Sequence, residues 1–343
     1  MQHINAAPLM HFPQPLKLRW WERVLHFKKP AVTSRGAMTE RRTCIIEANG
    51  TGLGECCIMP GLLPEPDADE LDYWCRRVEA RQGLEGITAP SPIQFALECA
   101  LQAALHPGHP RWDTPFSRGE AGIPIHHLIW MDKVENMMAA MKDGIERGFT
   151  CLKMKVGALS FKEELRLIQE AHASFPQAEI RVDANGAFTP ANAQQKLEAL
   201  AEAGVSIIEQ PIPRGQWKAM AELCRNAPVP IALDEELINA SPAELLPLVQ
   251  PQGIVIKPSL HGGLLAAQKW AELAEEYGIR WWVNSALESS TGLTALSEWC
   301  AYAAPENELQ GLGKGNLFTD DDGAQIELKD SQLWYKLIEK MNN

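Results

Sequence analysis

The hydrophobic pattern changes near residue 120 and divides the chain into two parts. Downstream of about residue 122, short apolar stretches alternate with amphipathic segments. From Val134 to Ile145, for example, apolar residues recur every three or four positions, as on one face of a helix. The expected strands between such helices are 124–130, 150–155, 178–183, 205–209, 229–234, 253–257, 280–284 and, with a weaker pattern, 309–312.

Regular alternation of strands and helices predicts a parallel sheet. Two of the helices begin with the sequence of a capping box, at Ser160 with Glu163 and at Ser241 with Glu244. Seven or eight strand–helix units in about 200 residues fit a TIM-type barrel better than an open doubly wound sheet. The open sheet is the alternative, but the glycine-rich turn typical of it does not follow the first strand.

The first part of the chain has a different pattern. Residues 14–60 are rich in strand formers and turns, and Asn49-Gly50 is typical of a two-residue hairpin turn. Two helical stretches follow, at about 67–82 and 91–106. This part is expected to be an antiparallel sheet with its helices grouped separately.

Composition narrows the choice of partners. The 343 residues are 45% hydrophobic and 22% charged, with a net charge of −12, so nucleic acid and membrane surfaces are unsuitable partners. No apolar run reaches the roughly 18 residues of a membrane span. The start of the chain lacks the pattern of a signal peptide, and eight scattered cysteines without a Cys-x-x-Cys pair predict reduced, buried thiols. We therefore expect a cytoplasmic protein.

Three carboxylates stand at the ends of three consecutive strands. Asp183, Glu209 and Asp234 each close one apolar stretch, 26 and 25 residues apart. The C-terminal ends of barrel strands carry the active site, so these side chains are expected to meet. Like charges so close together require a cation, and oxygen ligands favour a hard divalent ion such as Mg²⁺. The alternative, that each carboxylate only caps the following helix, leaves their common register unexplained.

Lysines stand at two further strand ends. Lys153 and Lys155 flank Met154, so both point to the same side of their strand. Lys257 ends the strand that follows Asp234 and would face this pair across the mouth of the barrel. Repulsion between neighbouring ammonium groups, and a nearby cation, favour the neutral amine, so one lysine can act as a base near neutral pH.

A base, a metal and an opposed lysine suit the removal of a proton next to a carboxylate. Such a proton is weakly acidic, and the barrier is the dianionic enediolate that its removal leaves. A metal on the carboxylate oxygens stabilises this charge as it develops. A lysine on either face can then take or return a proton.

These residues resemble the enolase superfamily, in particular its muconate-lactonising subgroup. The matching pieces span the barrel in the family's order, which makes them specific for the subgroup although not for a substrate. They are Lys153-Met154-Lys155, Asp183-Ala184-Asn185, Glu209-Gln210-Pro211, Asp234-Glu235 and Lys257-Pro258.

The resemblance implies a modified TIM-type (β/α)7β barrel with an N-terminal α+β capping domain. Residues 1–118 would form the capping domain and 119–317 the barrel, and a tail from about 318 to 343 would pack with the cap. The implied ligands of Mg²⁺, for which Mn²⁺ could substitute, are Asp183, Glu209 and Asp234. The implied catalytic lysines are Lys155, Lys257 and Lys153.

Within the subgroup the chain is most similar to the o-succinylbenzoate synthases, through Arg181 and the segments 284–290 and 311–318. Dipeptide epimerases carry Asp-x-Asp where this chain has Gly311-Leu312-Gly313. The implied reaction is the dehydration of 2-succinyl-6-hydroxy-2,4-cyclohexadiene-1-carboxylate to o-succinylbenzoate in menaquinone biosynthesis. Lys155 would take the proton next to the ring carboxylate and return it to the departing hydroxide, with Lys257 mainly a cation beside the intermediate.

The substrate's second carboxylate, on the succinyl arm, needs a recognition site. The segment 289–292 at a helix start offers backbone N–H groups, and 261–263 allows close backbone approach. Ordinary helix capping is the alternative for both. The basic segment 27–36 is expected to cover the mouth as a lid. The expected substrate contacts are Ser285, Ser289, Ser290, Gly262, Arg35 and Arg181.

Other interpretations keep the barrel but change its use. The same site would suit an N-acylamino acid racemase or another epimerase, which needs both lysines as bases. A barrel that only binds a ligand is disfavoured because all three carboxylates and all three lysines are present. The expected partner is a small dicarboxylate, and a homo-oligomer is compatible with the sequence. His126 and His127 have no metal-spaced partner and receive no role.

Overall fold

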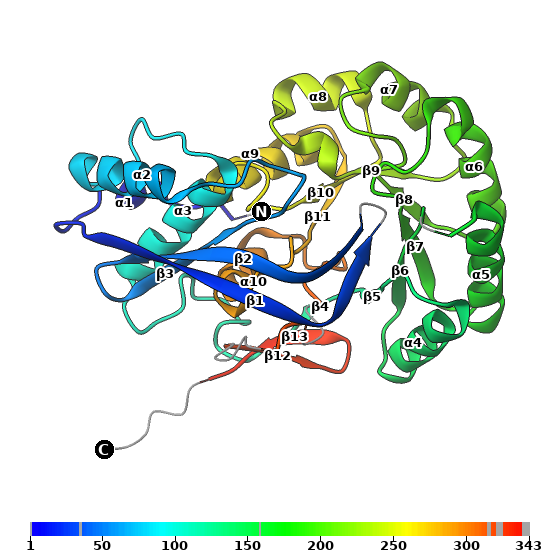
Figure 1. The fold of residues 1–343 in the computed structure, drawn as a ribbon, viewed down its shortest axis with the longest axis horizontal. Coiled ribbons are helices and arrows are strands. Elements are labelled where there is room, and N and C mark those ends of the chain that lie inside the picture. The colour runs from blue at the N-terminus through cyan, green and yellow to red at the C-terminus, as the bar shows by residue number, and fades with distance from the viewer. Residues whose placement is uncertain (1, 34–35, 158, 314–316, 320–324, 338–343) are drawn as a thin grey trace.

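The computed structural model describes residues 2–33, 36–157, 159–313, 317–319 and 325–337. Within these residues, an antiparallel sheet with three helices forms one side of the molecule, and a parallel sheet surrounded by helices forms the other (Figure 1). A small sheet near the C-terminus lies beneath them. None of the helices in the described part of the chain is long and apolar enough to cross a membrane.

The N-terminal sheet is a meander of β1 (Leu18–Thr33), β2 (Gly36–Ala48) and β3 (Gly52–Cys57). The predicted hairpin turn is confirmed, because Asn49 and Gly50 both have left-handed φ angles, of 51° and 72°. A Cβ on Gly54 would lie 1.9 Å from the Ala96 carbonyl oxygen, so glycine lets a helix approach β3 closely. The helices of this part are α1 (Ala7–Met10), α2 (Ala68–Arg81) and α3 (Ser91–Leu105).

Seven parallel strands form the barrel sheet, in the order β11 to β5. The predicted alternation is confirmed, and the strands are short and mostly buried. They are β5 (His127–Ile129), β6 (Cys151–Lys155), β7 (Glu179–Asp183), β8 (Ile207–Glu209), β9 (Ile231–Leu233), β10 (Gly253–Ile256) and β11 (Arg280–Val283).

Helices follow these strands on the outside of the barrel (Figure 1). The predicted capping box at Ser160 and Glu163 is confirmed. The one predicted at Ser241 is wrong, because the N–H of Glu244 donates to the Ser241 carbonyl and the side chain makes no cap bond. The helices are α4 (Val134–Glu146), α5 (Phe161–Ser174), α6 (Pro190–Glu202), α7 (Trp217–Asn226), the 3-10 turn η1 (Glu235–Leu237), α8 (Pro242–Val249), α9 (Gly263–Glu276) and α10 (Ser290–Ala303).

The barrel closes through the weakest of the predicted strands. The His126 N–H donates to the Gln310 carbonyl at 3.1 Å, and the Gly311 N–H donates to the Val283 carbonyl at 2.7 Å. Residues 310 and 311 therefore join the two ends of the sheet as an eighth strand reduced to single bridges. Further along, Phe318 pairs with Phe27 of β1. The strands β12 (Ile326–Lys329) and β13 (Gln332–Tyr335) form a hairpin on β4 (Ile123–Pro124).

Buried carboxylates from the N-terminal part hold two barrel helices at their starts. Glu98 of α3 accepts hydrogen bonds from the N–H groups of Leu264 and Leu265 at the start of α9, at 2.5 and 3.1 Å. Glu55 of β3 accepts the N–H groups of Ser289 and Gly292 at the start of α10, each at 3.0 Å. Negative charge at a helix N-terminus is stabilising. These contacts fix the loops that follow β10 and β11.

The interior is apolar and its thiols are unpaired. All eight cysteines are buried and free, which confirms the prediction from their spacing. Inside the barrel, Trp282 packs with Val255 and other apolar side chains of neighbouring strands. Its ring also receives the guanidinium of Arg181, 4.9 Å from the ring centroid.

Candidate active site

The three carboxylates meet at the carboxyl end of the parallel sheet. Asp183 and Glu209 lie opposite each other as the last residues of β7 and β8, and Asp234 follows β9 directly. All three are buried, and one oxygen from each lies within 4.8 Å of those from the other two. The register of adjacent parallel strands therefore brings together side chains that are far apart in the sequence.

The three lysines lie against these carboxylates. Lys153 donates to Glu209 at 2.5 Å, and Lys155 donates to Asp183 at 2.5 Å. Lys257 pairs in the same way with Asp234. The structure thus brings all six predicted side chains together at one site.

The ion pairs set the charge of the site. Burial alone would raise the pKa of Asp183, but the ammonium groups of Lys155 and Lys153 outweigh it and hold this pKa well below its ordinary value. Burial and the charge of Asp183 raise the pKa of Glu209 well above its ordinary value. Two carboxylates this close in a dry site do not ionise equally without further positive charge.

The lysine electrostatics differ from the expectation of a neutral amine. Burial lowers the pKa of Lys153, but Glu209 and Asp183 outweigh it, and the net pKa is raised. The pKa of Lys257 is also raised, because Asp234 and Glu209 outweigh burial. The prediction emphasised repulsion between neighbouring lysines, whereas in the structure every one of these lysines is paired with a carboxylate.

The donor set fits a divalent cation. Glu209 Oε1 and Asp234 Oδ1 are buried and have no hydrogen-bond partner among the described residues. Buried carboxylate oxygens without partners are costly unless a cation contacts them. Oxygen ligands without sulfur or nitrogen suit hard ions such as Mg²⁺ or Mn²⁺.

Gln210 ties the ends of two of these strands together. Its backbone is left-handed, with φ of 41°, and its side chain is fully buried. The side-chain oxygen accepts the N–H groups of Asp234 and Glu236 at 3.1 and 3.2 Å. Gln210 therefore fixes the backbone that carries Asp234 relative to Glu209, at the expense of an unfavourable φ angle.

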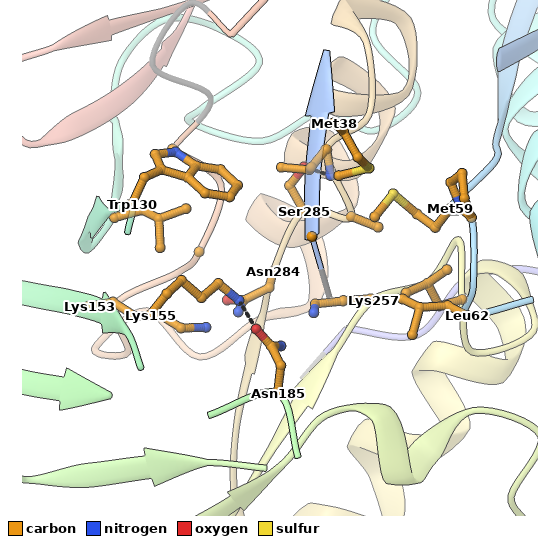
Figure 2. Close-up of a pocket in the computed structure, with 18 of the residues that line it drawn as sticks. Met38, Met59, Leu62, Trp130, Lys153, Lys155, Asn185, Lys257, Asn284 and Ser285 are labelled. Atoms are coloured by element: carbon orange, nitrogen blue, oxygen red, sulfur yellow. Dashed lines mark hydrogen bonds between the residues drawn. The ribbon is translucent and has the colours of Figure 1, made fainter. Parts of the chain in front are cut away.

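A cavity of about 220 Å³ opens beside the lysines. Figure 2 shows Lys155 and Lys257 pointing toward each other from opposite sides of it. Met38, Met59 and Leu62 of the N-terminal part lie along its edge, and Trp130 stands on the other side (Figure 2). The cavity therefore combines a charged floor with apolar walls, and both parts of the chain contribute to it.

Of the predicted substrate contacts, some line the cavity and others do not. Ser285 lines the cavity, and its hydroxyl donates to the buried Glu288 at 2.5 Å. Ser289 is fully buried and donates to Glu55, which occupies the start of α10. Ser290 and Gly262 are also not among the residues lining this cavity. The helix start proposed for the succinyl carboxylate thus already holds a carboxylate of the protein itself.

Of the two predicted arginines, only Arg181 lies among the described residues, and it does not line the cavity. Arg181 lies deeper in the barrel, on the same face of β7 as Asp183, and is buried. It pairs with Glu179 and Glu308, both at 3.0 Å, and covers Trp282. Arg35 lies outside the described residues. The described residues of the predicted lid segment 27–36 belong to β1 and the start of β2, and Gly36 lines the cavity together with the following Ala37 and Met38.

The structure also shows residues that the sequence did not single out as functional. His126 and Asn284 both line the cavity on the side away from the carboxylates. Strand alternation places His126 on the same face as Leu128 and Trp130, but neither histidine spacing nor a motif marks it. Only the closure of the barrel brings it beside Asn284.

Comparison with proteins of known sequence or structure finds several relatives of this chain. A model of the enolase C-terminal domain-like family matches residues 136–332. The o-succinylbenzoate synthase of Desulfotalea psychrophila is 40% identical, over 87% of this chain and 93% of the relative. A crystal structure of MenC from Desulfotalea psychrophila superimposes with a TM-score of 0.80 and 34% identity, over 94% of this chain and 100% of the other. An N-succinylamino acid racemase of Amycolatopsis is 28% identical, over 78% of this chain and 77% of the relative.

Proposed function

Because the chain belongs to the enolase C-terminal domain-like family, we propose that it catalyses the reaction of an o-succinylbenzoate synthase. This reaction dehydrates 2-succinyl-6-hydroxy-2,4-cyclohexadiene-1-carboxylate to o-succinylbenzoate in menaquinone biosynthesis. The observation that carries the proposal is a single site with three carboxylates within 4.8 Å and lysines on both sides of the adjoining cavity. The enzyme is a carbon–oxygen lyase.

Lys155 is the base in this proposal. Its ammonium group contacts Asp183 and Asn185, and its side chain reaches the cavity. Asp183, the ion-pair partner of Lys155, would also be one of the residues that hold the cation. The amine takes the proton next to the ring carboxylate, and the electron pair of that C–H bond moves toward the carboxylate, which becomes the enediolate; this pair forms the new ring double bond when the hydroxyl group leaves.

The three carboxylates would hold Mg²⁺, with Mn²⁺ as a substitute, and the cation would supply positive charge to the carboxylate oxygens of the substrate as the enediolate develops. The hydroxyl group then leaves from the neighbouring ring carbon with the electrons of its C–O bond. The ammonium of Lys155 returns its proton to this hydroxide, so that water departs and the ring becomes aromatic.

Lys257 and Lys153 have electrostatic roles. The raised pKa of Lys257, caused by Asp234 and Glu209 against the effect of burial, supports an ammonium group on the far side of the ring. Lys153 contacts Glu209 at 2.5 Å and Asp183 at 3.3 Å, where it orients both carboxylates. Both lysines therefore add positive charge where the intermediate is negative.

The proposal also includes the class of ligand and the cellular location of the enzyme. A small dicarboxylate is the ligand, and the unpaired thiols support a cytoplasmic location. The domain division at about residue 118 and a homo-oligomeric assembly stay predictions.

The direct test is incubation of the protein with the cyclohexadiene substrate and Mg²⁺. Loss of the diene's ultraviolet absorbance, with o-succinylbenzoate as the product by proton NMR, is expected. Unchanged substrate in the presence of a folded, Mg²⁺-loaded protein would refute the proposal.

The opposed lysines favour one second candidate, the racemisation of N-succinylamino acids. Lys155 and Lys257 face each other across the cavity, as a two-base mechanism requires (Figure 2). Incubation of an N-succinylamino acid in D₂O tests this side activity, because racemisation places deuterium at the α-carbon. Retention of the α-proton in both enantiomers would exclude it.

A further inference from the structure

The cavity has a second polar corner, on the side of the barrel opposite the carboxylates. Asp183, Glu209 and Asp234 follow β7, β8 and β9, whereas this corner lies where β5 and β11 meet the residues that close the barrel. Asn284 follows β11 directly and bridges to Gly311, and His126 precedes β5. Closure of the sheet therefore brings His126 and Asn284 together.

His126 is a buried imidazole with unused hydrogen-bonding capacity. Its side chain lines the cavity, the residue is only 4% exposed, and neither ring nitrogen has a hydrogen-bond partner of good geometry among the described residues. Burial and the positive charges of Lys153 and Arg181 hold its pKa well below the ordinary value, against a smaller effect of Asn284. The ring is therefore neutral and offers one N–H donor.

Asn284 and Gly311 complete the corner. Asn284 Oδ1 is buried without a partner among the described residues, and the side chain lines the cavity (Figure 2). A Cβ added to Gly311 would lie 1.8 Å from Asn284 Oδ1 and 2.8 Å from His126 Nε2. Asn284 and His126 therefore both pack closely against Gly311, where only glycine leaves them room.

Other side chains that line the cavity offer fewer free polar groups. Met38, Met59 and Leu62 are apolar, and Trp130 carries a single indole N–H. The Ser285 hydroxyl already donates to Glu288 and accepts the N–H of Leu287. A polar group of the substrate that lies away from the carboxylates can therefore be recognised at His126 and Asn284.

We propose that His126 and Asn284 form the subsite for the terminal carboxylate of the succinyl arm. This inference rests on the proposed function, in which the ring carboxylate lies with Asp183, Glu209 and Asp234, so the arm extends to the opposite side. The imidazole N–H and the Asn284 amide, turned so that its NH₂ faces the cavity, donate to the arm's oxygens. The charges of Lys153 and Arg181 nearby favour an anion there.

Binding of two product-like ligands tests this subsite without turnover. The ligands are o-succinylbenzoate and 2-butanoylbenzoate, in which a methyl group replaces the terminal carboxylate. Calorimetry in saturating Mg²⁺ compares the wild-type protein with His126→Phe, which removes the donor and keeps a ring. We expect His126→Phe to weaken o-succinylbenzoate binding by about tenfold or more and 2-butanoylbenzoate binding by less than about twofold.

The neighbouring His127 provides a matched control. It lies on the opposite face of the strand, where its ring packs on Phe149 with centroids 4.8 Å apart and its Nε2 lies 3.2 Å from the Ala140 carbonyl oxygen. His127→Phe should bind both ligands as the wild type does. Melting curves verify that each variant is folded, and Asn284→Leu provides the same comparison if His126→Phe does not fold.

The outcomes separate this inference from the proposed function. Equal losses for both ligands, or no loss for either, in the folded His126→Phe or Asn284→Leu protein would overturn the subsite while the proposed function stands. A wild-type protein that fails to bind o-succinylbenzoate would overturn both.

Discussion

Lys155 ends β6 and Lys257 directly follows β10, and the two lysines differ in their carboxylate partners. Lys155 shares Asp183 with Lys153, so two ammonium groups compete for one carboxylate. Lys257 has Asp234 as its own partner, and its backbone N–H donates to His261 at 3.0 Å. The two lysines therefore differ in how strongly they compete for a carboxylate partner.

Replacement of Lys155 by alanine should abolish dehydration. A positioned general base contributes about 10²- to 10⁴-fold, so the rate constant at saturating substrate should fall at least that far. The exposed Lys142 on α4, which pairs only with Glu146 at 3.7 Å, gives the control variant Lys142→Ala with unchanged activity. The ultraviolet assay measures both, and near-normal turnover by Lys155→Ala would show that another group is the base.

Replacement of Glu209 by glutamine should remove divalent-metal binding. The change keeps the size of the side chain but removes one of three charges that approach within 4.8 Å. Titration calorimetry with Mg²⁺ should show at least a tenfold loss of affinity, while the exposed Glu276→Gln on α9 binds as the wild type does. Equal affinity in the two variants would place the metal elsewhere.

The side chains at the ends of regular strands could be predicted from the sequence, whereas those at the place where the barrel closes could not. Asp183, Glu209 and the lysines follow from strand spacing, because parallel neighbours bring equivalent positions together. His126 depends on contact with residues almost 160 positions later, for which the local pattern holds no signal. Likewise, the start of α10 looked available in sequence, but Glu55 reaches it from a distant strand.

Helices α9 and α10 show how elements of the two parts of the chain are coupled. Each follows a strand that contributes to the cavity, and each begins on a carboxylate of the N-terminal part. Arg41 neutralises Glu55 with a hydrogen bond of 2.7 Å, and both side chains are fully buried. The helix starts are therefore docking points that keep Lys257 and Ser285 in position.

Glu98 makes one docking point sensitive to pH. Burial, only partly offset by hydrogen bonds from Gln94, Leu265 and Leu264, raises its pKa from 4.5 to about 7. The folded state thus binds this proton more tightly than the unfolded state does. The contribution of protonated Glu98 to the free energy of unfolding is therefore fully present below about pH 4.5 and is lost as the pH rises through 7. Relative to Glu98→Gln, the wild-type free energy of unfolding should fall by about 2 kcal/mol between pH 5 and 8. Urea denaturation at both values measures this, and parallel pH curves would contradict it.

The Arg41–Glu55 pair gives a prediction for the other docking point. Glu55→Gln leaves the guanidinium of Arg41 buried without its charge partner, which should lower the free energy of unfolding by about 3–5 kcal/mol. The double variant Arg41→Met with Glu55→Gln should be less destabilised than the sum of the single variants. Additive effects in urea denaturation would show that the two charges do not depend on each other.

The elements themselves were largely predictable, and their ends were less so. Buried parallel strands leave short apolar runs, and β6, β7 and β10 fall inside the expected ranges. The capping signature at Ser241 failed because its side chain makes no cap hydrogen bond. The eighth strand was the weakest in pattern because it is made of single bridges at residues 310 and 311.

The whole molecule places apolar side chains of the N-terminal part beside the charged residues of the barrel mouth. The barrel contributes the carboxylates and lysines, whereas Met38, Met59 and Leu62 come from the N-terminal part and enclose the cavity (Figure 2). Exclusion of water strengthens the electrostatic interactions on which proton removal depends. Neither part of the chain therefore builds the site alone, and its shape could not be inferred from separate motifs.

A crystal structure of the protein with Mg²⁺ and o-succinylbenzoate tests this arrangement most directly. We predict one Mg²⁺ in contact with Asp183, Glu209 and Asp234, and the benzoate ring between Lys155 and Lys257. A metal bound away from these carboxylates, or a ring outside the cavity with both lysines still paired to their carboxylates, would contradict the proposed dehydratase site.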